Sequence, residues 1–367
     1  ARIPWSSQGR LVFSAIMSIS LWFIAGLAGW LPERAGRLVA GTVVTFLAVV
    51  TVLAPFLWIA PRYRFPEPVA AVSGDTPVDF TPPGAAGPTM RLVETRVATP
   101  NVTPGGSVEV SLTWEALARM DRNWSTFVHL QDSAGFLAGQ RDTYPGLGLI
   151  ATRDLPVGTR WTDHYIVPVS ASAYAPESLE VLIGLYDYAT CPARCERMVL
   201  KSGDNALRIG DVVLSPRDSE AGVPNPVTFN FANLMELRGY SLDQRQAYPG
   251  DTLTLTLYWV GRSQMDIDYS VSTQIIAPDT RIFAQDDAWP LDGMRPTTGW
   301  MPGEALIDTY PLTLNANTPP GEYALQIVVY HAAPDGSFPK LQLVNAEGRL
   351  VEDFVLLTRV RVLEEPQ

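Results

Sequence analysis

The sequence contains little lysine and histidine, and it is poor in charge overall. Of its 367 residues only Lys201 and Lys340 are lysines, and charged residues make up 18%. Acidic residues outnumber basic ones, which gives a formal net charge of −11. Because such a chain lacks the basic surface that binds phosphate backbones, we expect no nucleic-acid partner.

The scarcity of metal-binding side chains excludes several kinds of site. Two cysteines cannot form a disulfide scaffold or a four-thiolate zinc site, and three histidines are too few for a histidine-rich metal centre. The sequence has no Cys-x-x-Cys-His haem signature, no glycine-rich phosphate loop and no Gly-x-Ser-x-Gly elbow. We therefore predict no cofactor, no metal site and no catalytic residue in this chain.

Two long apolar runs stand near the start of the chain. Residues 11–32 and 38–61 carry no charged side chain, and each exceeds the roughly 20 residues that a spanning helix needs. We predict a transmembrane helical hairpin over residues 1–64, with a tight loop from Glu33 to Arg37. Pro55 would either kink the second helix or mark its approach to the membrane interface. A signal peptide followed by one anchor is the alternative, but signal sequences have shorter apolar cores.

A hairpin places both chain ends on one side of the membrane. Arginines flank the runs on both sides, so the positive-inside rule does not choose that side. Residues 1–64 hold six of the 27 basic and one of the 38 acidic residues, which leaves the remainder strongly acidic. An acidic region with a close cysteine pair favours an extracytoplasmic location for both termini. Gly26, Gly29 and Gly41 would allow close packing against other helices.

An internal repeat follows a segment rich in proline and glycine at residues 65–88, which we predict to be an extended linker. Residue i matches residue i+145 without a gap from about residue 90 to 165; shared pairs are Met90/Met235, Trp114/Trp259, Asp142/Asp287, Asp163/Asp308 and Tyr165/Tyr310. We therefore predict two copies of one domain, at residues 89–215 and 216–367.

Each copy has the sequence pattern of β-structure. Apolar residues alternate with polar ones over residues 108–114 and 253–259, after Pro-Gly turns. Turn signals recur about every 8–12 residues, which is typical of a sandwich. The predicted fold is an all-β region of two tandem immunoglobulin-like sandwiches, with the helical hairpin before it. Tyr323 is a candidate for a tyrosine corner, whereas the first copy has Leu179 there.

The shared acids are the first candidate site residues. Asp142/Asp287 and Asp163/Asp308 could bind calcium or a sugar, or they could accept hydrogen bonds from local backbone groups. Their presence in both copies favours a structural role.

Trp289 and Trp300 are candidates for stacking on a glycan, although tryptophan in a sandwich more often fills the core. Cys191 and Cys195 are four residues apart and could form a disulfide in an oxidising compartment; free thiols are the alternative.

The order of features resembles the C-terminal region of large bacterial integral-membrane glycosyltransferases of the dolichyl-phosphate-mannose–protein mannosyltransferase type. The motifs that carry the resemblance are Gln8-Gly9-Arg10 before the hairpin, the proline-rich linker, Phe127-Val128-His129-Leu130, Gln140-Arg141-Asp142 and Gly184-Leu185-Tyr186-Asp187. In that family an acidic residue of an early extracytoplasmic loop is catalytic. This chain lacks the corresponding segment, so none of its residues inherits that role.

These observations lead to one leading expectation and two alternatives. The leading one is a non-catalytic accessory or stabilising subunit of a larger complex in a bacterial cell membrane, for example an energy-transducing complex. Its partners would be the lipid bilayer and other membrane subunits. The first alternative is the glycan- or acceptor-binding part of a membrane glycosyltransferase. The second is an adhesion module with the hairpin as a plain anchor.

Overall fold

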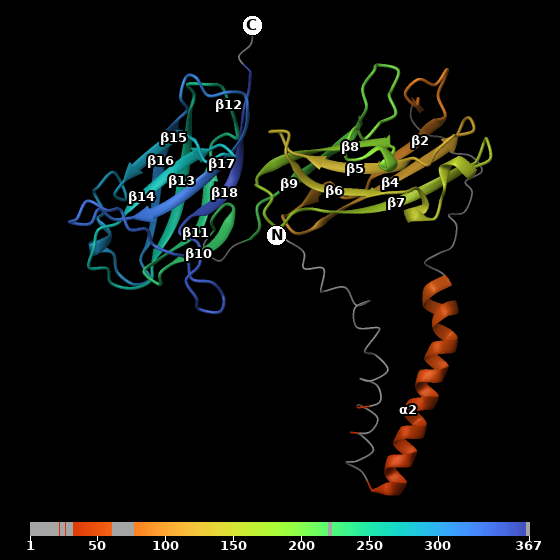
Figure 1. Cartoon of the computed structure of the whole chain (residues 1–367), viewed down its shortest axis with the longest axis horizontal. Helices are drawn as coiled ribbons and strands as arrows, with labels where there is room; N and C mark the ends of the chain where they lie inside the picture. Colours follow the sequence, from red (N-terminus) through yellow and green to blue (C-terminus); the bar gives the residue numbers. More distant parts are fainter. Residues whose placement is uncertain (1–21, 23–25, 27–31, 61–76, 219–221, 365–367) are drawn as a thin grey trace. The chain divides into compact units, whose positions relative to one another are not determined.

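The computed structural model describes residues 22, 26, 32–60, 77–218 and 222–364. The chain divides into two units, residues 1–66 and 67–367, and each is described by itself. The first unit contains a long helix and the second is built from strands (Figure 1).

The described helix of the first unit is α2 (Glu33–Ala54), which continues into a π-helical segment, η3 (Pro55–Ile59). Proline lacks the amide hydrogen of the ordinary helical ladder, so the change of winding begins at Pro55. The threonine hydroxyls of Thr42 and Thr51 donate to the carbonyl oxygens of Leu38 and Leu47. These bonds satisfy the hydroxyls within the helix itself.

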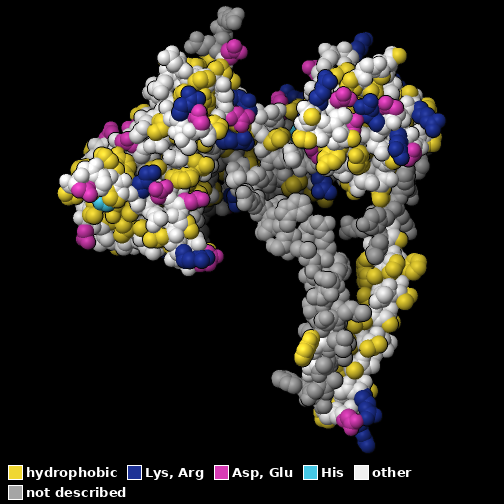
Figure 2. Space-filling model, in the orientation of Figure 1, with side chains coloured by type: hydrophobic (Ala, Val, Ile, Leu, Met, Phe, Trp, Pro, Cys, Tyr) yellow, Lys and Arg dark blue, Asp and Glu magenta, His cyan; other side chains and the backbone are white. Residues whose placement is uncertain are grey.

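Helix α2 is long and apolar enough to cross a membrane. The most apolar 18-residue stretch within Glu33–Trp58 has a mean hydropathy of 2.3, and this is the one such helix among the described residues. Figure 2 shows hydrophobic side chains along this helix, away from the charged residues at its start. Leu38, Phe46 and Phe56 are all more than 60% exposed. Such an exposed apolar surface is typical of a helix that contacts lipid or other apolar helices.

The structure corrects the predicted loop of the hairpin. Residues Glu33 to Arg37 form the first turn of α2, and the exposed Glu33 carboxylate pairs with Arg37 one helical turn later. The helix predicted at residues 38–61 therefore begins at Glu33. The helix predicted at residues 11–32 lies outside the described residues except for Trp22 and Gly26, so the hairpin stays a prediction.

The second unit contains two sets of strands. The first set is β1 (Val78–Phe80), β2 (Met90–Val97), β3 (Asn101–Val102), β4 (Ser107–Ala116), β5 (Ser125–Gln131), β6 (Leu137–Thr143), β7 (Arg160–Pro168), β8 (Glu177–Tyr186) and β9 (Leu207–Leu214). The second set is β10 (Pro226–Phe231), β11 (Met235–Leu242), β12 (Gln246–Ala247), β13 (Thr252–Gly261), β14 (Ser270–Ile276), β15 (Ile282–Ala288), β16 (Ala305–Thr313), β17 (Gly321–Tyr330) and β18 (Val355–Val362).

The two sets have the same topology, as the repeat predicts. The four-stranded sheets have the orders β1-β2-β4-β7 and β10-β11-β13-β16. The five-stranded sheets have the orders β3-β9-β8-β5-β6 and β12-β18-β17-β14-β15. In each five-stranded sheet the short edge strand, β3 or β12, pairs parallel with the last strand of the copy, β9 or β18. The neighbouring pairs β8–β9 and β17–β18 are antiparallel.

Each copy has a hydrophobic core between its two sheets. In β4 and β13 the predicted alternation is confirmed, since the apolar side chains face inward and Trp114 and Trp259 are buried. Burying one such large side chain contributes about 2–3 kcal/mol relative to leaving it exposed. The cores are separate clusters, one made chiefly by residues of the first copy and one by the second.

Strand β1 lies inside the segment predicted to be linker. Phe80 is fully buried and its ring lies 5.5 Å from that of Trp114, while Asp79 pairs with Arg91 on the neighbouring strand. These contacts make residues 78–80 part of the first sandwich. The predicted linker boundary at residue 88 is therefore wrong, because the proline content of the segment masked a short strand.

The candidate tyrosine corner is present in the second copy only. The hydroxyl of Tyr323 donates to the carbonyl oxygen of Pro319 at 2.6 Å, and its ring packs edge-on against Phe283 at 5.1 Å. This bond holds the entry to β17.

We expect Tyr323→Phe to lower the free energy of unfolding by about 1 kcal/mol, because it removes one largely buried hydrogen bond and keeps the ring. Chemical denaturation followed by tryptophan fluorescence measures the change. The control is Tyr248→Phe at an exposed turn position, which should leave stability unchanged. Equal effects of the two substitutions would contradict the assignment.

Candidate functional site

The two sandwiches meet at a buried ion pair. Nη1 of Arg245, just before β12, lies 2.7 Å from Oδ2 of Asp132 and 3.5 Å from Oε1 of Glu177. The side chains of Arg245 and Asp132 are each 6% exposed. Asp132 follows β5, and its second oxygen accepts a hydrogen bond from the amide of Phe136 at 2.8 Å. The acceptor is thus fixed in place by its own turn.

Aromatic rings surround this ion pair. The guanidinium groups of Arg245, Arg359 and Arg361 lie 5.1, 4.3 and 4.8 Å from the ring centre of Phe136. The Arg245 guanidinium also lies 4.9 Å from the ring of Tyr174. A cation held over an aromatic face in a desolvated setting contributes about 1–2 kcal/mol. Phe136 of the first copy is therefore the apolar anchor for three arginines of the second.

Backbone hydrogen bonds complete the contact. The hydroxyl of Tyr174 donates to the carbonyl oxygen of Leu242 at 2.7 Å and accepts from the Leu242 amide at 2.9 Å. Burial raises the pKa of Tyr174, so the hydroxyl stays protonated as this donor role requires. Asn225 accepts from the Ala175 amide and donates to the Tyr240 carbonyl. We call Arg245, Asp132, Glu177, Phe136 and Tyr174 the junction cluster.

The junction cluster is made of residues that the repeat does not share. In the 145-residue register Arg245 corresponds to Pro100, Asp132 to Ala277 and Phe136 to Arg281. Sequence reasoning missed these residues because it looked for what the copies have in common. The signal that could have found them is the opposite one. It is a charged or aromatic residue near a strand end that occurs in one copy and not in the other.

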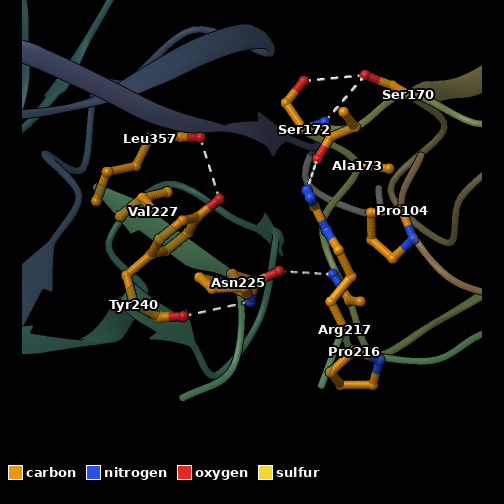
Figure 3. Close-up of a pocket in the computed structure, with 13 residues that line it drawn as sticks. Pro104, Ser170, Ser172, Ala173, Pro216, Arg217, Asn225, Val227, Tyr240 and Leu357 are labelled. Atoms are coloured by element: carbon orange, nitrogen blue, oxygen red, sulfur yellow. Dashed lines mark hydrogen bonds between the residues drawn. The ribbon is translucent and has the colours of Figure 1, made fainter. Parts of the chain in front are cut away.

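A pocket of about 310 Å³ is lined by residues of both copies, among them Ser170, Arg217 and Tyr240 (Figure 3). Several of its polar residues are bonded within the chain: Ser170 to Ser172, Arg217 to the Ala171 carbonyl, and Asn225 as described.

The shared acids Asp163 and Asp308 are structural. Asp163 is 2% exposed and accepts hydrogen bonds from the Gly146 amide, the Trp161 indole and the Tyr165 hydroxyl. Asp308 accepts from the amides of Leu291 and Thr309 and from the Tyr310 hydroxyl. Burial raises the pKa of both carboxyl groups, and the hydrogen bonds to the charged form oppose this. In each copy the acid ties an edge strand of the four-stranded sheet, β7 or β16, to the loop after β6 or β15, the edge strand of the five-stranded sheet.

The other shared acids, Asp142 and Asp287, are exposed on the edge strands β6 and β15. Asp142 pairs with Nε2 of His129 at 3.1 Å, while Asp287 accepts from the side-chain amide of Gln285. The described residues contain no group of acids, histidines and cysteines arranged to hold a metal ion. His164 bonds to Ser111 on an outer face at 2.8 Å, and Asp163 faces the core, so these three do not form a triad.

The tryptophan candidates differ. Trp300 is fully buried and its indole donates to the Arg295 carbonyl, so it cannot stack on a glycan. Its ring packs in the apolar core, where most tryptophans of a β-sandwich lie. Trp289 is 47% exposed, which keeps it a candidate.

The cysteine and glycine candidates have separate outcomes. Cys191 and Cys195 are joined in a disulfide that closes a small loop after β8, so the free-thiol alternative does not hold.

The glycines of the predicted hairpin are a separate matter. Among the described residues, Gly41 and Gly26 have no neighbour within 4 Å of a built Cβ atom. Gly29 lies outside the described residues.

The chain matches no protein-family model, and it has no significant match among curated proteins.

We expect Asp163→Asn to lower the free energy of unfolding by about 2 kcal/mol, because the new amide N–H would face the Trp161 indole N–H, and two donors cannot bond. Asp308→Asn should cost less, since the Tyr310 hydroxyl can rotate to accept instead. Urea denaturation of both variants measures the difference. A larger loss for Asp308→Asn would contradict this account of the two sites.

We expect Arg245→Ala to uncouple the two sandwiches. It leaves Asp132 buried without its cation, which typically costs about 3–5 kcal/mol, so calorimetry should resolve two unfolding transitions in place of one. Arg208→Ala is the control, because Arg208 forms an exposed ion pair with Asp211 within one copy. A single transition in Arg245→Ala at the temperature of the unchanged protein would show that the junction cluster does not couple the domains.

Proposed function

We propose that this chain is a non-catalytic, membrane-anchored accessory protein whose paired sandwiches form one stiff extracytoplasmic arm. The observation that carries the proposal is the uncovered helix α2, whose spanning window is not buried against the described protein at all. Such a helix needs a bilayer, and its glycine-bearing side suits other helices. The buried junction cluster supports the proposed stiff arm, because an arm that positions a partner needs two domains held in a fixed arrangement.

Several features support an extracytoplasmic location on a bacterial cell. The strand-rich region is acidic, and it holds a disulfide, which persists in oxidising compartments. The proposed immunoglobulin-like class rests on the strand order, with a short parallel edge strand beside the last strand of each copy. The partners in this proposal are the lipid bilayer and the helices of a larger membrane complex, for which an energy-transducing complex is one candidate.

We expect the full chain to co-elute in stoichiometric amount with other membrane proteins after mild detergent extraction. Gly41→Leu should reduce that co-elution by filling the space where a partner helix approaches. Val50→Leu is the matched control, because nine residues along a helix place it on the opposite side. Elution of the unchanged chain alone, as a monomer, would favour the plain adhesion module and overturn the accessory role.

A second function is favoured by a specific observation. The chain would be the glycan- or acceptor-binding part of a membrane glycosyltransferase, in line with the family resemblance. The supporting feature is a polar pocket on the outer face of β14, β15 and β17, which has an exposed aromatic ring on its wall.

A further inference from the structure

The outer-face pocket belongs to the five-stranded sheet of the second copy. It has a volume of about 330 Å³, at the low end of small-molecule pockets. Its lining is formed by Ser272, Gln274, Gln285, Asp287, Gln326 and Tyr330, with Val328, Phe338 and Lys340 completing the wall.

In the first copy the same sheet position carries a large ring, and the hollow on that face is lined by Phe127, His129, Leu182 and Arg197. Phe127 occupies the place of Ser272 and lies against Gly184, where a built Cβ atom would be 2.5 Å from the Phe127 ring. The Arg197 guanidinium covers the Phe127 ring at 4.8 Å, and His129 packs beside it at 4.6 Å. The second copy replaces this ring with a small hydroxyl, and Val328 stands where Gly184 made room. The two faces therefore differ in what lines their hollows: aromatic and basic side chains in the first copy, and amide, hydroxyl and carboxylate groups in the second.

The floor of the pocket is a connected row of amides. Nε2 of Gln326 donates to Oε1 of Gln274 at 3.0 Å, and Nε2 of Gln274 donates to Oγ of Ser272 at 2.8 Å. At the edge, Gln285 donates to Asp287. Within the described chain, these bonds leave the Oε1 atoms of Gln326 and Gln285 and one amide hydrogen on each glutamine without a protein partner. The row therefore offers donors and acceptors side by side.

The wall of the pocket combines the aromatic ring of Phe338 with the ammonium group of Lys340, which is paired with an acid. Phe338 is 64% exposed and stands edge-on to Tyr330, with ring centres 5.8 Å apart. Burial raises the pKa of Tyr330, and so does the nearby Asp287 carboxylate, so its hydroxyl remains a donor. Lys340 lies 3.6 Å from Asp353, which offsets its charge.

Building on the glycan-binding role, we propose that the outer-face pocket binds a neutral sugar residue of a glycan. Vicinal hydroxyl groups both donate and accept, which matches a row of glutamine amides with a carboxylate at its edge. The C–H face of a sugar ring is apolar and fits the exposed Phe338 ring. A phosphate or an acidic sugar would meet the Asp287 carboxylate, while the Lys340 cation is already paired with Asp353.

The test is calorimetric titration of the full chain, in lauryldimethylamine oxide because that detergent has no sugar headgroup. The probes are mannotetraose, cellotetraose and xylotetraose, with trigalacturonate as the acidic comparison. We expect at least one neutral probe to bind, and trigalacturonate to bind about tenfold more weakly or not at all. Binding of no neutral probe, or a preference for trigalacturonate, would overturn the proposal.

Variants separate the pocket from the rest of the surface. The double change Ser272→Phe with Val328→Gly copies the Phe127–Gly184 pair of the first sandwich, so it should fold and should abolish binding. Gln285→Ala should weaken binding about tenfold, whereas Gln140→Ala, the equivalent change in the first copy, should leave it unchanged. Retained binding in the filled variant would show that the sugar binds elsewhere. None of these changes touches α2, so co-elution with membrane partners is a separate readout.

Discussion

The arrangement of the strand-rich unit depends on one buried contact, the ion pair between Arg245 and Asp132. Removing an arginine and an aspartate from water costs free energy. That cost is offset only if the two charges pair with each other and their remaining donor and acceptor atoms are hydrogen-bonded. Here the turn after β5 orients the acid, and the Phe136 and Tyr174 rings cover the cation. The contact therefore forms in one geometry only. A purely apolar junction could slide, whereas this one sets a definite register between the two sandwiches.

The two copies share a framework and differ in particular surface residues. What they share is the strand order, the tryptophan cores and the Asp–Tyr pairs that tie an edge strand of the four-stranded sheet to a loop. What they do not share is the junction cluster and the lining of the outer face of the five-stranded sheet. On that face, Phe127 and Gly184 of the first copy correspond to Ser272 and Val328 of the second, which replaces a large ring by smaller side chains.

The sequence was sufficient for the repeat, the strand pattern and the short disulfide loop, because each depends on neighbours in the chain or on a regular period. It was insufficient where tertiary contacts decide. Phe80 enters the first core from a segment that composition assigns to a linker, and Trp300, a candidate for glycan stacking, is buried. Glu33 to Arg37 form the first turn of α2, although their charges suggested a loop between two apolar runs. Arg245 and Asp132 are 113 residues apart, and no local pattern links them.

The central claim is that the two sandwiches form one rigid arm, and an interdomain distance distribution tests it most directly. Cysteines introduced at Asp204 and Asp335, which are exposed positions of the first and second copies, would carry spin labels. Pulsed electron paramagnetic resonance would measure the distance between the two labels in the full chain with its native disulfide intact. The account predicts one narrow distance peak that does not broaden when salt is raised, because the junction ion pair is shielded from solvent. A broad or salt-dependent distribution would contradict it.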